Sequence, residues 1–463
     1  MYKLYYQFPN TWFGDCMPFG KDGKFYLYHQ RDTRKPGPFG EPFGWSLATT
    51  TDFVHYEDHG IAIPGGTEEE QDQYIFAGTV FEAEGLYHAM YTGFNREYAK
   101  QGKDPQVLMK ATSKDLYHWE KNDEKLVAPQ PGYDPEDWRD PFVMWNEEKQ
   151  EYLMILGARK KSPHINRGCT VCFTSKNLHD WKFQGDFWAP NIYSMHEMPD
   201  LFKMGDWWYL IISEYSEKNK IVYRRSKSLD GPWTAPIDDA FDGRCYYAGR
   251  TAFDGKRRVL FGWVNTRDTW RDDAHWTWGG TFVPHEIYQR EDGSLGAKIP
   301  DSVLEAFETP RVLAKDHTLH TVDSSEELPL AQIRDKFCKF EARVKFSEGT
   351  RSFGVRVKQN ETTGESYDFR LLVGENRLYF DRIPCIPSDV NNKGLERPIQ
   401  LKAGKEYLIQ IIVDDDIATI YIDGVALNVR MYNENQSGHG ISMYVTDGTL
   451  EILEANISDR LIK

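Results

Sequence analysis

A short motif that recurs about every sixty residues constrains the fold of this chain more than any other feature. Three copies cover residues 48–56, 111–119 and 173–181, and a looser fourth covers residues 225–233. The first three combine a Ser/Thr-rich start with Asp or Asn, a hydrophobic residue and a closing aromatic. The closing aromatics of the four copies are 63, 62 and 52 residues apart. Periods of a few tens of residues are typical of solenoids, propellers and other arrays of one supersecondary unit.

Apolar, β-branched and aromatic runs alternate with these motifs, at residues 25–29, 86–92, 152–157, 208–213 and 259–264. Helical periodicity is nearly absent and turn residues are dense, which favours an all-β fold. Five similar four-stranded units predict a five-bladed β-propeller, in which the inner strands of all the blades lead to one central pocket.

The composition changes after about residue 310. Residues 300–310 predict a linker or a short helix, and strands of alternating polarity follow at 340–346, 353–358, 407–413 and 418–424. Period-2 alternation with Asp/Gly turns favours an antiparallel β-sandwich. We therefore expect the propeller over residues 1–300, a linker over 301–320 and a C-terminal β-sandwich over 321–463.

The charge and the apolar pattern limit the partners that this chain can have. A net charge of −15 and a pI near 5.4 argue against nucleic acid, whose phosphates would be repelled. An aromatic share of 14% suits stacking on neutral sugar rings, although large β-sheet proteins are rich in aromatics in any case. No stretch approaches the roughly 18 apolar residues of a membrane span, so no membrane partner is expected. The N-terminus lacks the apolar core of a signal peptide, which predicts a cytoplasmic protein.

The six cysteines are sparse and irregularly spaced, which fits reduced thiols. Cys169 and Cys172 form a lone Cys-x-x-Cys, and their offset of three inside a predicted strand puts them on opposite faces. We therefore expect no metal site and no cofactor. Nothing in the sequence indicates an oligomeric state.

Three carboxylates stand in separate short motifs: Asp15 in Phe-Gly-Asp-Cys-Met-Pro, Asp140 in Trp-Arg-Asp-Pro, and Glu197 in His-Glu-Met-Pro-Asp. Each stands just before a predicted strand, so in a propeller they can meet although they are far apart in sequence. A retaining glycosidase needs one carboxylate as nucleophile and one carboxylic acid as proton donor, and a third acid can hold sugar hydroxyls. The alternatives are a turn residue at Asp15 and a cap at Asp140.

These motifs resemble glycoside hydrolase family 32, the group of invertases, inulinases and levanases, and the resemblance extends nearly end to end. It implies a five-bladed propeller followed by a β-sandwich, and the release of terminal fructose from sucrose or short fructooligosaccharides with retention. By position in the motifs, it implies that Asp15 is the nucleophile, Glu197 the general acid/base, and Asp140 the acid that binds ring hydroxyls and stabilises the transition state. The sandwich has no comparable set of acids, so we expect it to be structural or glycan-binding.

The same resemblance implies a set of substrate-binding side chains, which are Gln30, Trp45, Phe76, Arg139 and Trp278. Trp45 lies in a Gly-Trp-Ser segment that matches a wall of the family's pocket, and the alternative is a core residue. Arg139 binds substrate in one interpretation and holds its own loop in the other.

The chain also departs from the family pattern. Gly14 stands where the family usually has Asn, and residues 16–20 (Cys-Met-Pro-Phe-Gly) stand in place of the usual Pro-Asn-Gly. Since the missing amides would bond the fructosyl unit, we expect this end of the pocket to have a different shape. Two other functions stay open: another five-bladed furanosidase, such as an arabinofuranosidase or a xylosidase, and a glycan-binding propeller without catalysis. The presence of both Asp15 and Glu197 favours an enzyme.

Overall fold

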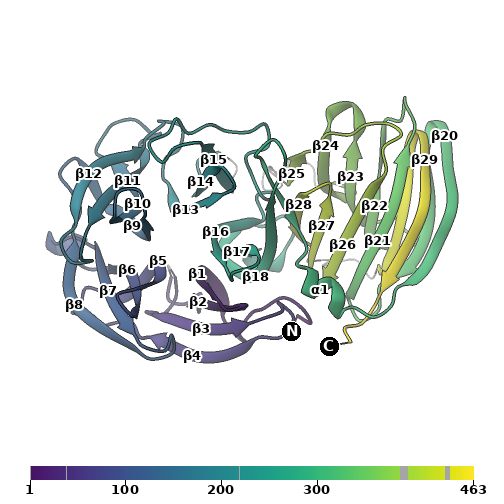
Figure 1. Ribbon diagram of the computed structural model, residues 1–463. Coiled ribbons are helices and arrows are strands. Elements are labelled where there is room, and N and C mark those ends of the chain that lie inside the picture. The colour runs from purple at the N-terminus through teal and green to yellow at the C-terminus, as the bar shows by residue number, and fades with distance from the viewer. Residues whose placement is uncertain (1, 38, 218, 386–394, 433–437, 463) are drawn as a thin grey trace.

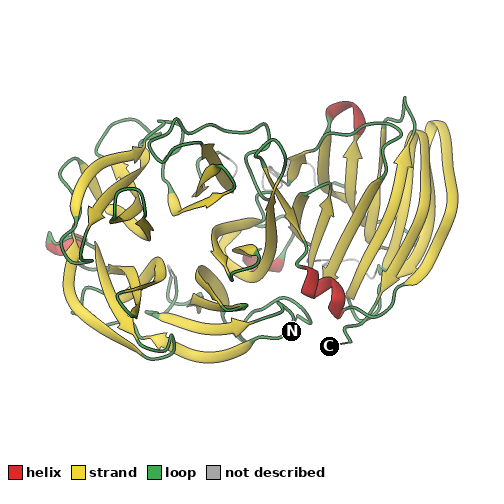
Figure 2. Cartoon of the chain, viewed as in Figure 1, coloured by secondary structure: helices red, strands yellow, loops and turns green. Residues whose placement is uncertain are grey.

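The computed structural model describes residues 2–37, 39–217, 219–385, 395–432 and 438–462. A ring of small sheets, formed by the first part of the chain, lies beside a stack of long strands formed by the last part (Figure 1). Nearly all regular structure in these residues is β-strand, and the helical segments are short (Figure 2). None of the helices described is long and apolar enough to cross a lipid bilayer.

The ring is a five-bladed β-propeller of antiparallel strands, as the repeat predicted. Blade one contains β1 (Trp12–Lys21), β2 (Lys24–Asp32), β3 (Trp45–Thr50) and β4 (Glu57–Ile63). Blade two contains β5 (Tyr74–Ala83), β6 (Leu86–Phe94), β7 (Gln106–Ser113) and β8 (Trp119–Val127). Blade three contains β9 (Tyr133–Asn146), β10 (Glu151–Lys160), β11 (Gly168–Ser175) and β12 (Lys182–Trp188). Blade four contains β13 (Glu197–Met204), β14 (Trp207–Glu214) and β15 (Lys220–Ser226), and blade five contains β16 (Tyr246–Phe253), β17 (Arg258–Arg267), β18 (Trp276–Gln289) and β19 (Leu295–Lys298). The ring closes where β18 pairs with β1, through Phe13 and Gly280.

The recurring motif forms the turn between the third and fourth strands of blades one to three. In each copy the side-chain oxygen of the Asp or Asn accepts a backbone N–H from three residues ahead, at 2.8 Å. The next residue has a positive φ of 60°, 71° or 59°, at Phe53, Leu116 and Leu178. Asp and Asn favour such turns because they bond their own backbone, so the motif repeats because the turn repeats.

The inner strand of every blade has an irregular register at the same level, near the axis of the ring. The shifts fall between Phe13 and Cys16 in β1, Ile75 and Gly78 in β5, Arg139 and Phe142 in β9, Glu197 and Asp200 in β13, and Tyr247 and Arg250 in β16. Such bulges leave backbone groups unpaired and redirect side chains. All three acids singled out in the sequence lie within or beside one of these bulges.

The C-terminal strands form a β-sandwich. They are β20 (Arg311–Gln332), β21 (Phe337–Phe346), β22 (Ser352–Gln359), β23 (Ser366–Leu372), β24 (Arg377–Ile383), β25 (Glu396–Pro398), β26 (Tyr407–Asp414), β27 (Ile417–Ile422), β28 (Val425–Arg430) and β29 (Gly440–Ser458). The first part of β29 pairs with β22 and its last part with β21, so this long strand belongs to both layers. It turns from one layer to the other near Gly448, whose φ of 145° suits glycine.

The segment between the two parts differs from the expected linker over residues 301–320. A short helix, α1 (Asp301–Ala306), fits the expected linker or short helix at 300–310, and β20 begins at Arg311. The second half of the expected linker is therefore strand, because its backbone pairs with β29, starting at Arg311 and Ile457. The other helical turns within the described ranges are η1 (Ala99–Gln101), η2 (Asp268–Trp270) and η3 (Val373–Glu375).

Buried polar contacts join the sandwich to blade five. His285 lies 3.0 Å from Asp242 and 2.8 Å from the hydroxyl of Tyr421 in the sandwich. Arg430 in β28 donates to the carbonyls of Val264 and Asn265, at 2.9 Å each. Since buried polar groups are costly unless they are bonded, these contacts hold β17 in place, and Trp263 of β17 bonds Asp15 of the pocket described next.

Candidate active site

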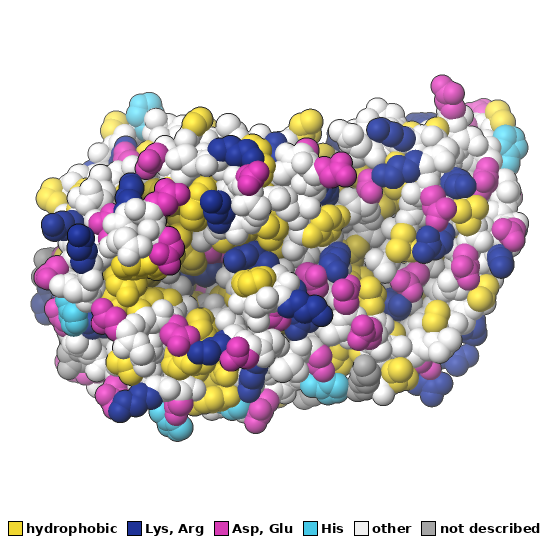
Figure 3. All heavy atoms as spheres, in the orientation of Figure 1, with side chains coloured by type: hydrophobic (Ala, Val, Ile, Leu, Met, Phe, Trp, Pro, Cys, Tyr) yellow, Lys and Arg dark blue, Asp and Glu magenta, His cyan; other side chains and the backbone are white. Residues whose placement is uncertain are grey.

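A cavity of about 380 Å³ opens at the axis of the propeller, near the lower end of the size range of small-molecule pockets. In the space-filling view, charged and hydrophobic side chains surround a hollow in the propeller half of the molecule (Figure 3). The cavity is lined by Asp15, Gln30, Phe39, Phe43, Phe76, Phe94, Arg96, Ala99, Pro105, Gln106, Glu136, Asp137, Arg139, Asp140, Glu197 and Trp278. All of them belong to the propeller.

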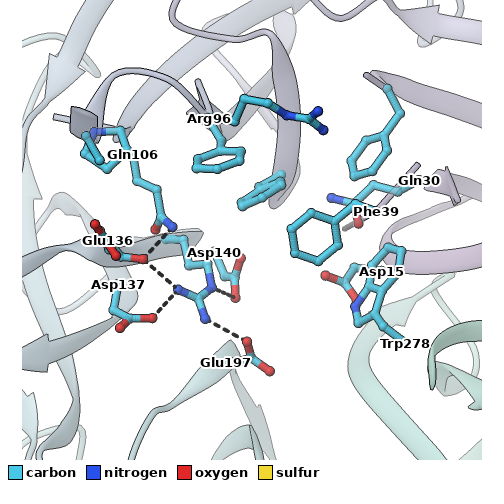
Figure 4. A pocket seen from close by; sticks show the side chains of 16 residues that line it. Asp15, Gln30, Phe39, Arg96, Gln106, Glu136, Asp137, Asp140, Glu197 and Trp278 are labelled. Atoms are coloured by element: carbon cyan, nitrogen blue, oxygen red, sulfur yellow. Dashed lines mark hydrogen bonds and ion pairs between the residues drawn. The ribbon is translucent and has the colours of Figure 1, made fainter. Parts of the chain in front are cut away.

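The structure brings the three acids from three blades into this one cavity. Asp15 comes from β1, Asp140 from β9, and Glu197 is the first residue of β13. Figure 4 shows Asp140 and Glu197 beside Arg139 on one side of the cavity and Asp15 on the other, next to Trp278. Asp140 has a φ of 63°, an uncommon conformation for a residue other than glycine, which is typical of functional sites.

Arg139 points toward these acids and also contacts its own segment, at Asp137 and the carbonyl of Glu136. Its guanidinium bonds Oε1 of Glu197 and Oδ1 of Asp137, at 2.7 Å each, and its Nε lies 3.9 Å from Asp140. Burial acts to lower the pKa of Arg139, but Glu197, Asp140 and Asp137 raise it well above its ordinary value. A second cation, Arg159, pairs with the other oxygen of Asp137 at 2.7 Å.

The second carboxylate oxygen of Glu197 accepts a hydrogen bond from the hydroxyl of Tyr247, at 2.7 Å. Burial, together with the nearby Glu197, raises the pKa of Tyr247 well above its ordinary value, so this residue stays a phenol. Arg139 and Tyr247 thus fix both oxygens of Glu197. Sequence reasoning missed Tyr247, because no local motif marks a tyrosine of blade five as a partner for an acid of blade four.

The charges of the two other acids act on Asp15. Trp263 donates its indole N–H to Oδ1 of Asp15 at 3.3 Å. Burial raises the pKa of Asp15 well above its ordinary value, and the charges of Asp140 and Glu197 raise it further. Trp263 opposes this rise. It lies in β17, and the sequence analysis did not identify it.

Asp140 is held by backbone contacts at the bulges. Its Oδ2 accepts the N–H of Met198 at 3.0 Å, and its own N–H donates to Thr92 at 3.0 Å. Burial raises the pKa of Asp140, and the cation of Arg139 opposes the rise. The bond to Met198 links the Asp140 bulge directly to the Glu197 bulge of the next blade.

Arg250, from the inner strand of blade five, ties the bulges of three other blades together. Its guanidinium donates to the carbonyls of Gly78, Pro141, Asp140 and Pro199, the last two at 3.0 Å each. Further along the same inner strands lies a second cavity of about 190 Å³, lined in part by Arg250. Arg250 is fully buried, and through the carbonyl of Asp140 it also contacts the segment that carries one of the three acids.

The side of the pocket next to Asp15 is aromatic. Trp278 and Phe43 stack with ring centroids 6.3 Å apart, and Phe76 and Phe94 stack at 4.5 Å. Gln30 is buried here and donates its amide N–H to the carbonyl of Ile75 at 3.1 Å. Its side-chain oxygen is buried and finds no donor among the described residues.

Trp45 does not lie in the pocket wall, where the sequence analysis expected it. It is fully buried behind the wall and donates its indole N–H to the carbonyl of Phe76 at 3.1 Å. Its ring packs between Tyr28 and Tyr91. Adjacent residues of a strand point to opposite faces, and the side of β3 that carries Trp45 faces the core.

Several pocket residues were absent from the sequence-based set. They are Phe39, Phe43, Phe94, Arg96, Ala99, Pro105, Gln106, Glu136 and Asp137. Most lie in connections or at strand ends, where no periodicity identifies the face of a side chain. Glu136 and Asp137 are exceptions, because they lie within β9, just before the Arg-Asp-Pro motif.

Two family models match this chain. The description "Glycosyl hydrolases family 32 N-terminal domain" matches residues 6–295, and "Glycosyl hydrolases family 32 C terminal" matches residues 307–459. A levanbiose-producing levanase of Bacillus subtilis (strain 168) is 26% identical over 97% of this chain and 89% of its own length. A raffinose invertase of Escherichia coli is 25% identical over 93% of this chain and 90% of its own.

Solved structures share the fold. Fructan 1-exohydrolase IIa from Cichorium intybus superposes with a TM-score of 0.80 at 16% identity, over 100% of this chain and 97% of that chain. The exo-inulinase from Aspergillus awamori gives a TM-score of 0.76 at 18% identity, over 98% of this chain and 97% of that chain. These likenesses agree with the propeller-plus-sandwich architecture observed here.

Proposed function

This chain belongs to glycosyl hydrolase family 32, and on that premise we propose that it releases terminal fructose from sucrose or short fructooligosaccharides with retention of configuration. The observation that carries the proposal is the meeting of Asp15, Asp140 and Glu197 in one pocket, with Glu197 held by Arg139 and Tyr247. The substrate is a small neutral carbohydrate. We propose that the propeller, over residues 1–300, carries the activity, since every residue that lines the pocket lies in it.

In the first step, the carboxylate of Asp15 attacks the anomeric carbon of the terminal fructosyl unit. Glu197 gives its proton to the departing glycosidic oxygen, so the leaving sugar departs as a neutral alcohol. Asp15 is then esterified to fructose, and Glu197 has become a carboxylate. Because the hydroxyl of Tyr247 can accept as well as donate, its contact with Glu197 survives both protonation states.

In the second step, a water molecule attacks the same anomeric carbon. Glu197 takes a proton from this water, and the ester bond to Asp15 breaks to regenerate its carboxylate. Two inversions give net retention. A sugar hydroxyl in place of water would give transfer instead of hydrolysis by the same route.

The crowding of the acids favours the transition state. Burial raises the pKa of Asp15, and repulsion from the nearby carboxyl groups of Asp140 and Glu197 raises it further. The anomeric carbon acquires positive charge as the glycosidic bond breaks. A positive charge placed between Asp15 and Asp140 relieves that repulsion, so the site binds the transition state better than the ground state.

The remaining pocket residues position the sugar in this proposal. Gln30 offers a free amide oxygen, Phe76 and Trp278 offer ring faces, and Arg139 offers its guanidinium edge beside Asp140. Arg250 holds the inner strands behind the acids by bonding the carbonyls of Asp140 and Pro199.

The test is free fructose released by the purified protein from sucrose and from 1-kestose, beside an arabinofuranoside and a xyloside, with Glu197→Gln as the control. We expect fructose from the fructosides with the intact enzyme only. Release of arabinose or xylose instead would replace the proposal with a related furanosidase. Binding of the sugars without turnover would indicate a glycan-binding propeller.

A further inference from the structure

The place beside the nucleophile that a side chain of residue 14 would fill is already occupied by Trp278. A Cβ atom built on Gly14 lies 2.4 Å from Cη2 and 3.0 Å from Cζ2 of the Trp278 indole. It also lies 3.0 Å from Cβ of Gln30. Real Cβ atoms essentially never approach a neighbour to 2.4 Å, so any larger residue at position 14 must displace the indole.

Other aromatic rings pack against the indole of Trp278. Its ring contacts Phe43 in a stacked arrangement at 6.3 Å, Phe39 edge-on at 5.8 Å and Trp263 edge-on at 5.9 Å. Its backbone carbonyl accepts a hydrogen bond from Arg34. Trp263 in turn donates to Asp15, so a shift of the indole would disturb the nucleophile.

Trp278 is nevertheless not a core residue. It is only partly buried, and it lines the cavity together with Asp15 and Gln30. Figure 4 shows its ring next to the carboxylate of Asp15. A ligand that reaches Asp15 therefore meets an indole at the point where an amide would stand if residue 14 were the Asn usual in the motif.

We propose that Gly14 and Trp278 are a matched pair that sets sugar specificity. This deepens the proposed function and rests on it. The glycine makes room for the indole, and the indole gives the fructosyl unit an apolar face to stack on beside the nucleophile. The site thereby recognises C–H groups of the terminal sugar where an amide would recognise a hydroxyl.

The chemical consequence concerns which glycosides the enzyme accepts as substrates. A site that hydrogen-bonds a hydroxyl rejects analogues lacking it by about 10⁴-fold or more, whereas apolar contacts discriminate by about 10–200-fold. Terminal sugars that lack or mask one hydroxyl on the Trp278 side are therefore substrates here. The accepted class is furanosides with a neutral, partly apolar face, not only unmodified fructosides.

The experiment is a double-mutant cycle on sucrose and 1-kestose with Gly14→Asn, Trp278→Ala and the two combined. We expect Gly14→Asn to lower kcat/KM by about 100-fold, because the amide displaces the indole. Trp278→Ala should raise KM about 10-fold with a smaller change in kcat. The double variant should be at least 10-fold more active than Gly14→Asn alone, because residues in contact are not additive.

Two controls make the cycle decisive. Gly374→Ala, at a glycine whose added Cβ meets nothing within 4 Å, should leave kcat/KM unchanged. Should Gly14→Asn fail to fold, Gly14→Ala with and without Trp278→Ala applies the same test, since alanine adds only the Cβ atom. Circular dichroism and the melting temperature report folding for each variant.

Three results would contradict the proposal that Gly14 and Trp278 act as a pair. They are an unchanged KM in Trp278→Ala, strict additivity in the double variant, or full activity in Gly14→Asn. Failure of the proposed function looks different, since the unmodified enzyme would then release no fructose. In that case isothermal calorimetry with sucrose on the same variants measures the stacking contribution, and equal affinity of the parent and Trp278→Ala would overturn the pair as well.

Discussion

The two sides of the pocket are built from different interactions. On the charged side, Asp140, Arg139, Glu197 and Tyr247 are joined mainly by hydrogen bonds, including two of 2.7 Å to Glu197. On the aromatic side, Trp278 and its neighbouring rings are joined by packing at 4.5–6.3 Å. Hydrogen bonds are directional and ring packing is much less so. The charged side therefore orients reacting atoms, and the aromatic side shapes the space that the sugar fills.

This contrast predicts that substitutions on the charged side lower kcat and substitutions on the aromatic side raise KM. The largest effect is expected for Glu197→Gln, which keeps the shape but removes the proton that the leaving sugar needs. General acid–base catalysis contributes about 10²–10⁴-fold, so kcat on sucrose should fall by about 10³-fold. Steady-state kinetics measures it, with the exposed Glu147→Gln as the matched control. A fall below tenfold would contradict the assigned role.

A smaller pair of effects sharpens the comparison. Tyr247→Phe removes one bond to a charged group, worth about 1.5–3 kcal/mol, so kcat should fall by about 10-fold or more with KM nearly unchanged. Phe76→Leu, on the aromatic side, should raise KM a few-fold and leave kcat nearly unchanged. Steady-state kinetics on sucrose for both variants tests whether the charged side acts on kcat and the aromatic side on KM. A change of KM in Tyr247→Phe together with a change of kcat in Phe76→Leu would refute this division.

The third expected effect is a shift in pH dependence. Asp15 must be ionised to attack, so kcat/KM falls as the pH drops through its raised pKa, and the acid limb lies above the ordinary range of an aspartate. The bond from Trp263 lowers the pKa of Asp15, so Trp263→Phe should move the acid limb to higher pH. The profile of kcat/KM against pH measures this. A limb that moves to lower pH would contradict the arrangement.

The smallest effect concerns stability. The pKa of the Asp15 carboxyl is higher in the folded than in the unfolded state, so the folded protein binds this proton more tightly. The free energy of unfolding therefore decreases as the pH rises from the ordinary pKa of an aspartate through the raised one. At neutral pH the charge on Asp15 therefore destabilises the fold, and Asp15→Asn should raise the melting temperature by about 2 °C. Calorimetry at neutral pH and near pH 4 tests it. The gain should shrink at the lower pH, and a lower melting temperature at neutral pH would contradict the account.

Much of the fold was predictable because its signals are local. The turn built on Asp52, Asp115 and Asn177 repeats with the blades, so its period identified the propeller. The three acids stood in short motifs beside inner strands, and their family resemblance located them. By contrast, β20 begins earlier than expected because its partner strand, β29, lies more than a hundred residues away and leaves no local mark.

The side chains that surround the acids were harder to predict, for geometric reasons. Whether Trp45 faces the core or the pocket depends on how the blades close into a ring, not on its neighbours in sequence. Tyr247 and Trp263 reach Glu197 and Asp15 across blade boundaries. Gly14 was visible in the sequence as a departure from the family motif, but the indole of Trp278 that lies against it is seen only in three dimensions.

The most direct test of the central claim is to trap the sugar on its nucleophile. With a fructosyl fluoride the leaving group needs no proton, so Glu197→Gln should form the fructosyl-enzyme but hydrolyse it slowly. Mass spectrometry of acid-quenched, digested protein should then find one fructosyl unit on the peptide that contains Asp15. An adduct on another carboxylate, or none while fructose is still released, would contradict the assignment of Asp15 as the nucleophile of a retaining enzyme.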